Sequence, residues 1–151
     1  MSELEARLER METIEAARGA SWRYAVAIDT VDFDMLADVF SADAVLTTRR
    51  GSQVGREAIV EYYRKALADN VLRKHFLTNQ QVTWLSVGEA RMDSYFIYTF
   101  AGDDTSVFGW GNYMDRVRID DGVARIVEKT ISVDVSADSR VGWATPATGP
   151  S

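Results

Sequence analysis

His75 is the only histidine of the chain and lies in the segment RKHFLTN, residues 73–79. An imidazole can accept and return a proton in the physiological pH range. To act as a general base, it needs one ring nitrogen free and the other donating to a fixed acceptor. A carboxylate in that place selects the tautomer and stabilises the imidazolium that forms. His75 is therefore a candidate catalytic base, and the alternative is a strand-end histidine bonded to backbone or water.

Asp29 is the candidate acceptor for this histidine. It lies one helical turn after Ala25, at the border of an apolar helical face, and most of its neighbours in the sequence are apolar. A carboxylate in such a setting is partly desolvated and requires a partner. Asp32 and Asp34 instead have the positions of a helix cap and a solvated side chain. The alternative for Asp29 is an ordinary helix-end carboxylate.

Tyr24 is the third candidate catalytic residue, because its hydroxyl could donate to a substrate carbonyl or to a departing oxygen. It precedes Asp29 by five residues, roughly 140° around an ideal helix, so the two side chains do not stack directly. They converge only if the helix ends near Asp29. The alternative is a core tyrosine with its hydroxyl at the rim of the core.

Three helices are predicted in the first half of the chain. Apolar and small side chains recur at spacings of three and four in the first segment, which is typical of one helical face: Ile14, Ala17, Ser21, Tyr24, Ala25 and Ile28. A second short helix follows Asp32, which is a plausible N-cap. A third helix follows Gly55. A short strand, residues 43–48, lies between the second and third helices.

The second half changes period and predicts four strands, at residues 75–87, 89–102, 106–120 and 123–135. These segments are rich in β-branched and aromatic residues. Asp121 and Gly122 predict a tight hairpin between the last two strands. Helices followed by an antiparallel meander predict an α+β fold, with helices packed on one face of a curved sheet that encloses an apolar pocket. Six strand residues are predicted to contact substrate: Phe76, Phe96, Tyr98, Phe108, Trp110 and Asn112.

Composition restricts the class of protein further. The chain has 151 residues, a net charge of −6 and no cysteine. Its length predicts one domain, at residues 1–140, with a tail at 141–151. The acidic balance argues against nucleic acid and anionic membranes as partners. No apolar run is long enough to span a membrane, and the charged N-terminus is no signal peptide, so a cytoplasmic protein is expected. The sequence does not support a metal, flavin, nicotinamide or nucleotide cofactor. A single histidine cannot build a histidine-rich metal site, and the sequence has no glycine-rich loop for binding phosphate.

Four segments resemble the SnoaL-like branch of the NTF2-like superfamily, over roughly residues 8–135: YAVAIDTVDFDMLADVFSADAVL, GREAIVEYYRKAL, KHFLTNQQVTW and GNYMDRVRIDDGVARIVEKTISVD. The resemblance implies a cone-shaped barrel and a homo-oligomer, a dimer or trimer. The scytalone dehydratase, bile acid 7α-dehydratase and hexachlorocyclohexane dehydrochlorinase group of this branch uses an Asp–His pair, whose places correspond to Asp29 and His75. A tyrosine of the bile acid enzyme is similar to Tyr24. A second histidine found in scytalone dehydratase has no counterpart, and Asn112 matches a strand asparagine only if one residue is inserted.

The resemblance and the residues together predict a cofactor-independent lyase that dehydrates a mostly apolar ring compound, such as a polyketide or a steroid-like molecule. His75 would remove a proton, Asp29 would orient His75, and Tyr24 would assist the carbonyl or the leaving hydroxyl. Isomerisation or ring closure would use the same parts. Two alternatives stay open: a polyketide cyclase that uses only a carboxylate, and a non-catalytic ligand-binding protein or oxygenase-type small subunit.

Overall fold

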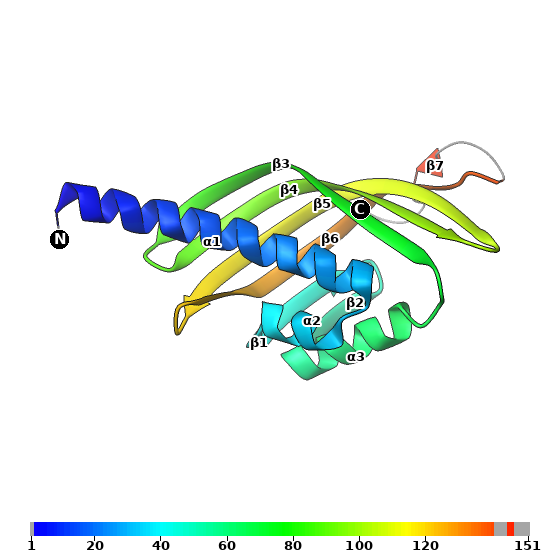
Figure 1. Cartoon of the computed structure of the whole chain (residues 1–151), viewed down its shortest axis with the longest axis horizontal. Helices are drawn as coiled ribbons and strands as arrows, with labels where there is room; N and C mark the ends of the chain where they lie inside the picture. The colour runs from blue at the N-terminus through cyan, green and yellow to red at the C-terminus, as the bar shows by residue number, and fades with distance from the viewer. Residues whose placement is uncertain (1, 141–144, 147–151) are drawn as a thin grey trace.

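The computed structural model describes residues 2–140 and 145–146. Three helices, α1 (Glu3–Thr30), α2 (Phe33–Val39) and α3 (Arg56–Ala66), pack against one face of a curved sheet (Figure 1). The strands are β1 (Phe40–Thr48), β2 (Gly51–Val54), β3 (Leu72–Ser86), β4 (Glu89–Gly102), β5 (Thr105–Asp120), β6 (Val123–Asp138) and β7 (Thr145–Pro146). The predicted α+β class, with helices on a curved sheet, is confirmed.

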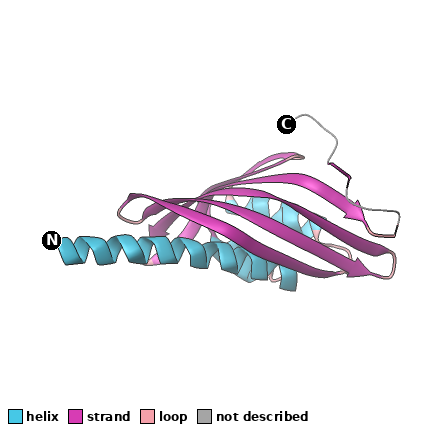
Figure 2. Cartoon of the chain, turned by 90° about the horizontal axis from the view of Figure 1, so that it is seen from above, coloured by secondary structure: helices cyan, strands magenta, loops and turns pink. Residues whose placement is uncertain are grey.

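The sheet is mixed and open rather than wholly antiparallel and closed. Its strands run in the order β2-β1-β6-β5-β4-β3, with β7 beside β6. The meander β3–β6 is antiparallel as predicted, whereas β1 pairs parallel to β6. The chain enters β1 directly from α2. In Figure 2 the helices lie along one side of the sheet, which we call the inner face.

Helix α1 positions the first candidate residue and has well-defined ends. At its start, Ser2 and Glu5 form a capping box, in which each side chain accepts a hydrogen bond from the other residue's backbone N–H. At its end, Val31 adopts a left-handed conformation with φ 56°, and Asp32 then caps α2, as predicted, by accepting from the N–H groups of Asp34 and Met35. The left-handed conformation of Val31 and the cap at Asp32 together define the end of α1, and Asp29 lies in its last turn.

The β5–β6 hairpin confirms a turn signal that the sequence carries. Asp121 and Gly122 both have positive φ values, 52° and 74°, as a two-residue type I′ turn requires. Strand β2 has no counterpart in the sequence prediction. It is four residues long and mostly exposed, so no alternation of apolar and polar residues announces it.

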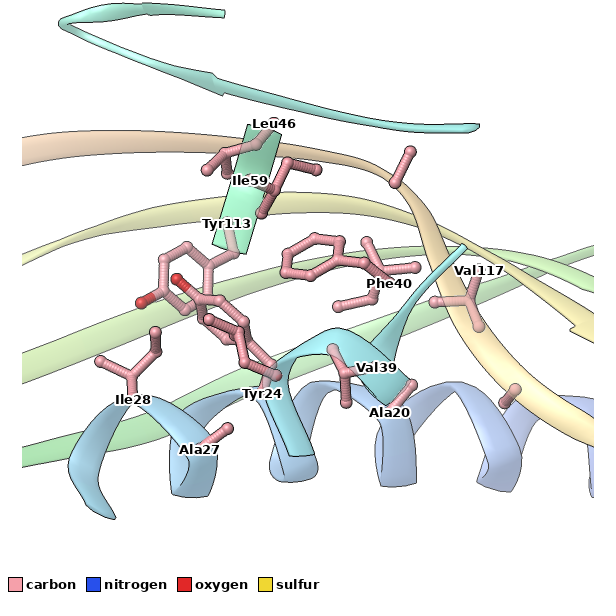
Figure 3. Close-up of a cluster of buried hydrophobic side chains, with 14 of the residues drawn as sticks. Ala20, Tyr24, Ala27, Ile28, Val39, Phe40, Leu46, Ile59, Tyr113 and Val117 are labelled. Atoms are coloured by element: carbon pink, nitrogen blue, oxygen red, sulfur yellow. The ribbon is translucent and has the colours of Figure 1, made fainter. Parts of the chain in front are cut away.

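The core lies between the inner face of the sheet and the three helices. Small residues on α1, such as Ala20 and Ala27, let the helix approach the sheet closely, and Tyr24 projects into the centre (Figure 3). Tyr113 of β5 and Phe40 of β1 pack edge-on against the Tyr24 ring, with centroids 5.8 and 6.0 Å away. The centre of this fold is thus aromatic, and it contains hydroxyl groups.

Most of the predicted tail, residues 141–151, lies outside the described residues. Thr145 and Pro146 form β7, which pairs antiparallel with Ser136 and Val135 of β6. Within the part of the chain that the structure describes, no helix is both long and apolar enough to cross a membrane.

Candidate active site

Asp29 and His75 are in direct contact. One carboxylate oxygen of Asp29, Oδ1, lies 2.7 Å from Nδ1 of the His75 ring. The other oxygen, Oδ2, accepts a hydrogen bond from the backbone N–H of His75 at 3.1 Å. Side-chain exposure is only 9% for His75 and 8% for Asp29. The carboxylate therefore fixes both the ring and the backbone of the same residue, in a largely dehydrated setting.

The two residues come from elements that are far apart in the sequence but adjacent in space. Asp29 lies in the last turn of α1, and His75 lies near the start of β3, which is an edge strand of the sheet. His75 is paired in register with Tyr98 of β4, so both side chains lie on the inner face. The His75 ring is 6.2 Å from Tyr98, 6.4 Å from Phe96 and 6.0 Å from Phe100 between centroids.

This geometry specifies which nitrogen of His75 is available for proton transfer. A carboxylate only accepts hydrogen bonds, so the Nδ1 atom that faces Asp29 must carry the proton. In the neutral ring the lone pair is then on Nε2. If Nε2 takes a proton, the adjacent Asp29 carboxylate stabilises the resulting imidazolium. The pair has the arrangement of an oriented general base.

A cleft of about 550 Å³ lies beside this pair, between α1 and β3. Its lining residues come from both elements: Glu15, Arg18, Gly19, Trp22, Ala25, Val26 and Asp29 from α1, and His75, Leu77 and Gln80 from β3. Asp29 and His75 are thus placed at a concave surface that can admit a small molecule.

Tyr24 lies in the core rather than in this cleft. Its hydroxyl is 2.7 Å from the hydroxyl of Tyr63, and the side chain is almost fully buried. Burial raises the pKa of the Tyr24 hydroxyl well above its ordinary value, with a smaller contribution from Tyr113. Tyr24 therefore keeps its proton, and its hydroxyl either donates to or accepts from that of Tyr63. The structure separates it from the cleft lining, in contrast to the predicted role beside His75.

The six predicted substrate contacts divide between the two faces of the sheet. Phe96 and Tyr98 lie on the inner face beside His75. The other four alternate to the outer face, the side away from the helices: Phe76, Phe108, Trp110 and Asn112. Trp110 and Asn112 line a separate depression of about 430 Å³ there, and Asn112 donates to Asp134 at 2.8 Å. None of the six predicted contacts is among the residues that line the cleft beside His75.

The sequence analysis missed a buried ion pair behind the aromatic core. Lys129 Nζ lies 3.0 Å from both carboxylate oxygens of Asp115, and neither side chain is exposed. The ammonium also lies 3.6 Å from the centre of the Tyr113 ring and 4.1 Å from that of Tyr24. Asp115 alternates with Tyr113 and Val117 on the inner face of β5, so the strand period could have placed it inside.

Burial acts on both partners of this ion pair in the direction of the neutral forms. It raises the pKa of the Asp115 carboxyl and lowers that of the Lys129 ammonium, while the attraction between the two charges opposes both shifts.

Among residues 2–140, no group of three or more His, Cys, Asp or Glu side chains is arranged to hold a metal ion.

The fold and the Asp–His pair at the helix–sheet junction define an α+β protein with a carboxylate-bound histidine in a side cleft. Residues 9–130 match the SnoaL-like domain family. The chain therefore belongs to the SnoaL-like family, as the sequence segments indicated. No curated protein matches the chain.

Solved structures agree with this assignment. A candidate aromatic ring hydroxylase from Novosphingobium aromaticivorans has 28% sequence identity and a TM-score of 0.76, over 91% of this chain and 94% of that chain. A candidate scytalone dehydratase from the same species has 18% identity and a TM-score of 0.79, over 95% and 98% of the two chains. A hexachlorocyclohexane dehydrochlorinase, LinA-type3 from Novosphingobium barchaimii, has 16% identity and a TM-score of 0.77, over 95% and 96%. The last two similarities are at the level of the fold.

Proposed function

We propose that this protein is a cofactor-independent lyase in which His75 is the general base and Asp29 is the residue that orients it. The observation that carries the proposal is the double hydrogen bond of Asp29, at 2.7 Å to the ring nitrogen and 3.1 Å to the backbone N–H of His75. Because both its ring and its backbone are held, His75 keeps its second nitrogen, Nε2, in one orientation at the wall of the cleft. The candidate dehydratase and the dehydrochlorinase among the structural neighbours support elimination as the reaction type.

The reaction proceeds by removal of a proton and loss of water. His75 Nε2 takes the proton from a carbon next to a ring carbonyl, and the electron pair of that C–H bond forms the enolate. The enolate then expels hydroxide from the neighbouring carbon, which forms a C=C bond. The imidazolium returns its proton to the departing oxygen, so that water leaves and His75 is neutral again. Asp29 stabilises the imidazolium in between.

The alternatives from the sequence are less well supported by the geometry. A cyclase that uses only a carboxylate needs Asp29 to face the substrate, yet both of its oxygens contact His75. A purely structural histidine does not need a buried carboxylate on Nδ1. The candidate aromatic ring hydroxylase at 28% identity keeps an oxygenase-type subunit as the second candidate function.

Substitution of the pair tests the proposal. Fused-ring β-hydroxy ketones are incubated with the protein, and loss of water is followed by the absorbance of the conjugated product. We expect His75→Ala and Asp29→Asn each to lower kcat by roughly 10²–10⁴-fold, the usual contribution of general acid–base catalysis. Lys74→Ala is the matched control, because Lys74 precedes His75 on β3 but is exposed on the outer face. Near-normal turnover in either variant of the pair contradicts the proposal.

A further inference from the structure

The cleft extends well beyond the reactive pair. On α1, Arg18 precedes Asp29 by eleven residues, about three helical turns, so the two share one helix face about 16 Å apart. On β3, Gln80 follows His75 by five residues, which corresponds to roughly 16 Å of strand. All four residues line the same cleft. It is therefore an elongated groove, with the Asp–His pair at one end and Arg18 and Gln80 at the other.

The middle of the groove is apolar and open. Trp22 lies on its α1 side with 61% of its surface exposed, unusual for so large an aromatic side chain. Gly19 lies in the lining, although a glycine within a helix costs about 1 kcal/mol relative to alanine. An added Cβ at Gly19 would have its nearest neighbour 3.8 Å away, at an Arg23 guanidinium nitrogen. Packing within the fold therefore does not require glycine at this position.

A break in the edge strand shapes the polar end of the groove. Asn79 has a positive φ of 51°, and the pairing of β3 with β4 shifts register between Thr78 and Gln81. A β-bulge of this kind adds a residue to one strand and redirects its side chains. In a regular strand, Gln80 would lie on the face opposite to His75 and Leu77, because side chains alternate. The bulge explains why Gln80 nevertheless lines the same cleft.

Arg18 gives this end a positive charge that its neighbour holds only weakly. Its contact with Glu15 is 3.5 Å long, and the Glu15 carboxylate is 79% exposed. Exposed ion pairs one helical turn apart contribute little, because water screens them. The guanidinium can therefore turn to an anion within the groove without losing a strong partner, and a carboxylate suits its planar array of donors.

We propose that this groove binds an elongated, mostly apolar ring compound that carries an anionic group at the end away from the reacting carbon. Arg18 and Gln80 receive the anion, Trp22 packs against the ring system, and the reacting carbon lies at His75. This inference rests on the proposed function, since it names the substrate class for the same site. Arg18 is then a specificity-determining residue, and Gly19 keeps the groove open.

A pair of fluorescent probes with and without a charge tests the anion-binding end. Pyrenebutyrate and pyrenebutanol share the ring and the four-carbon chain and differ in the terminal carboxylate. We expect fluorescence anisotropy to show about fivefold tighter binding of the anion, the scale of one partly exposed ion pair. Arg18→Gln should abolish the preference, and Glu15→Gln should increase it. Arg49→Gln is the control, because it removes the same charge from the exposed β1–β2 turn and should leave the preference intact.

A second variant and an NMR signal complete the test. Gly19→Leu should weaken both probes at least tenfold while the circular dichroism spectrum stays native, because the added side chain fills the groove. The C2–H resonance of the single histidine should shift when either probe binds. Equal affinity of the two probes, an anion preference that persists in Arg18→Gln, or no saturable binding of either probe overturns the inference.

These outcomes are separable from those of the proposed function. If Arg18→Gln keeps the anion preference while His75→Ala abolishes turnover, the substrate class is wrong and the lyase stands. If the probes behave as expected while His75→Ala turns over normally, the groove is a binding site whose chemistry does not use His75.

Discussion

Two acid–base pairs of this chain have the same kind of contact and opposite surroundings. Asp29 and His75 join the end of α1 to the edge strand β3 and line a cleft. Asp115 and Lys129 join neighbouring central strands, and neither side chain is exposed. Both carboxylates use their two oxygens on one partner. What distinguishes the pairs is therefore access to the cleft, rather than the quality of the contact.

The comparison teaches that the position of a polar pair in the sheet decides whether a ligand can reach it. A central strand has a neighbouring strand on each edge, and the helices cover its inner face, so Lys129 is enclosed by Asp115 and by the rings of Tyr24 and Tyr113. An enclosed charge pair costs desolvation energy, which its attraction recovers only with good geometry. At the edge of the sheet the same type of pair remains within reach of a ligand. The enclosed pair should then affect stability most and the edge pair should affect turnover most.

The largest expected effect on stability is that of removing one partner of the enclosed pair. Lys129→Ala leaves the Asp115 charge buried without its cation, and we expect the free energy of unfolding to fall by about 3–5 kcal/mol. Urea denaturation at neutral pH measures this change. Lys65→Ala is the control, since Lys65 contacts Glu61 at 3.3 Å in an exposed pair on α3 and should cost about 0.5 kcal/mol or less. Equal losses in the two variants would remove the distinction between enclosed and exposed pairs.

The pH dependence of the Lys129→Ala variant sharpens the same comparison. Burial raises the pKa of Asp115 above its ordinary value of 3.8 in the folded protein, so the folded state binds this proton more tightly than the unfolded state. Its stabilising contribution is full below the unfolded pKa and is lost as pH rises through the folded pKa. Without Lys129 to oppose the shift, the stability deficit should shrink as pH falls from 7 toward about 4. A deficit that is constant over this range would argue against a buried ionised Asp115.

A smaller effect on stability is expected at the edge pair. Asp29→Asn keeps an oxygen that can accept from the His75 ring, but its amide nitrogen cannot accept from the His75 backbone N–H. Loss of one hydrogen bond predicts a fall of about 1 kcal/mol in the free energy of unfolding. The ring proton on Nδ1 gives a second readout, because the hydrogen bond to a carboxylate should shift its NMR resonance downfield. A cost as large as that of Lys129→Ala would place Asp29 among the structural residues.

Much of the fold could be predicted because its signals are local. The positive φ values at Asp121 and Gly122, the cap at Asp32 and the small-residue face of α1 each depend on a few neighbouring residues. The partner of Asp29 was predicted from the desolvation of a carboxylate together with the family resemblance. Strand β2 was not predicted, because a short exposed strand carries no periodic signal.

The site was predicted less completely, because the face to which a side chain points depends on register. A shift of one residue moves a side chain to the other face of the sheet. Trp110 and Phe76 are aromatic strand residues like Phe96, yet their register sends them to the outer face. Tyr24 lies on the same helix as Asp29, but its position around the axis turns it into the core. Lys129 was missed because the sequence does not show that Asp115 lies beside it on the next strand.

The smallest effect is expected at an exposed pair, which completes the series from enclosed to solvated. Hydrogen bonds from the side chain of Arg140, and to a smaller extent from its backbone N–H, lower the pKa of Asp138 from its ordinary value of 3.8 to about 2. A lowered carboxyl pKa gives a contribution that is present above the unfolded value and is lost as pH falls through the folded one. The urea midpoints of the wild type and Asp138→Asn should therefore differ slightly at pH 5 and converge toward pH 2. Added salt should reduce the difference at pH 5, because the pair is open to solvent. A loss of stability as large as that of Lys129→Ala, or one that does not change with salt, would contradict the ranking of these pairs by solvent exposure.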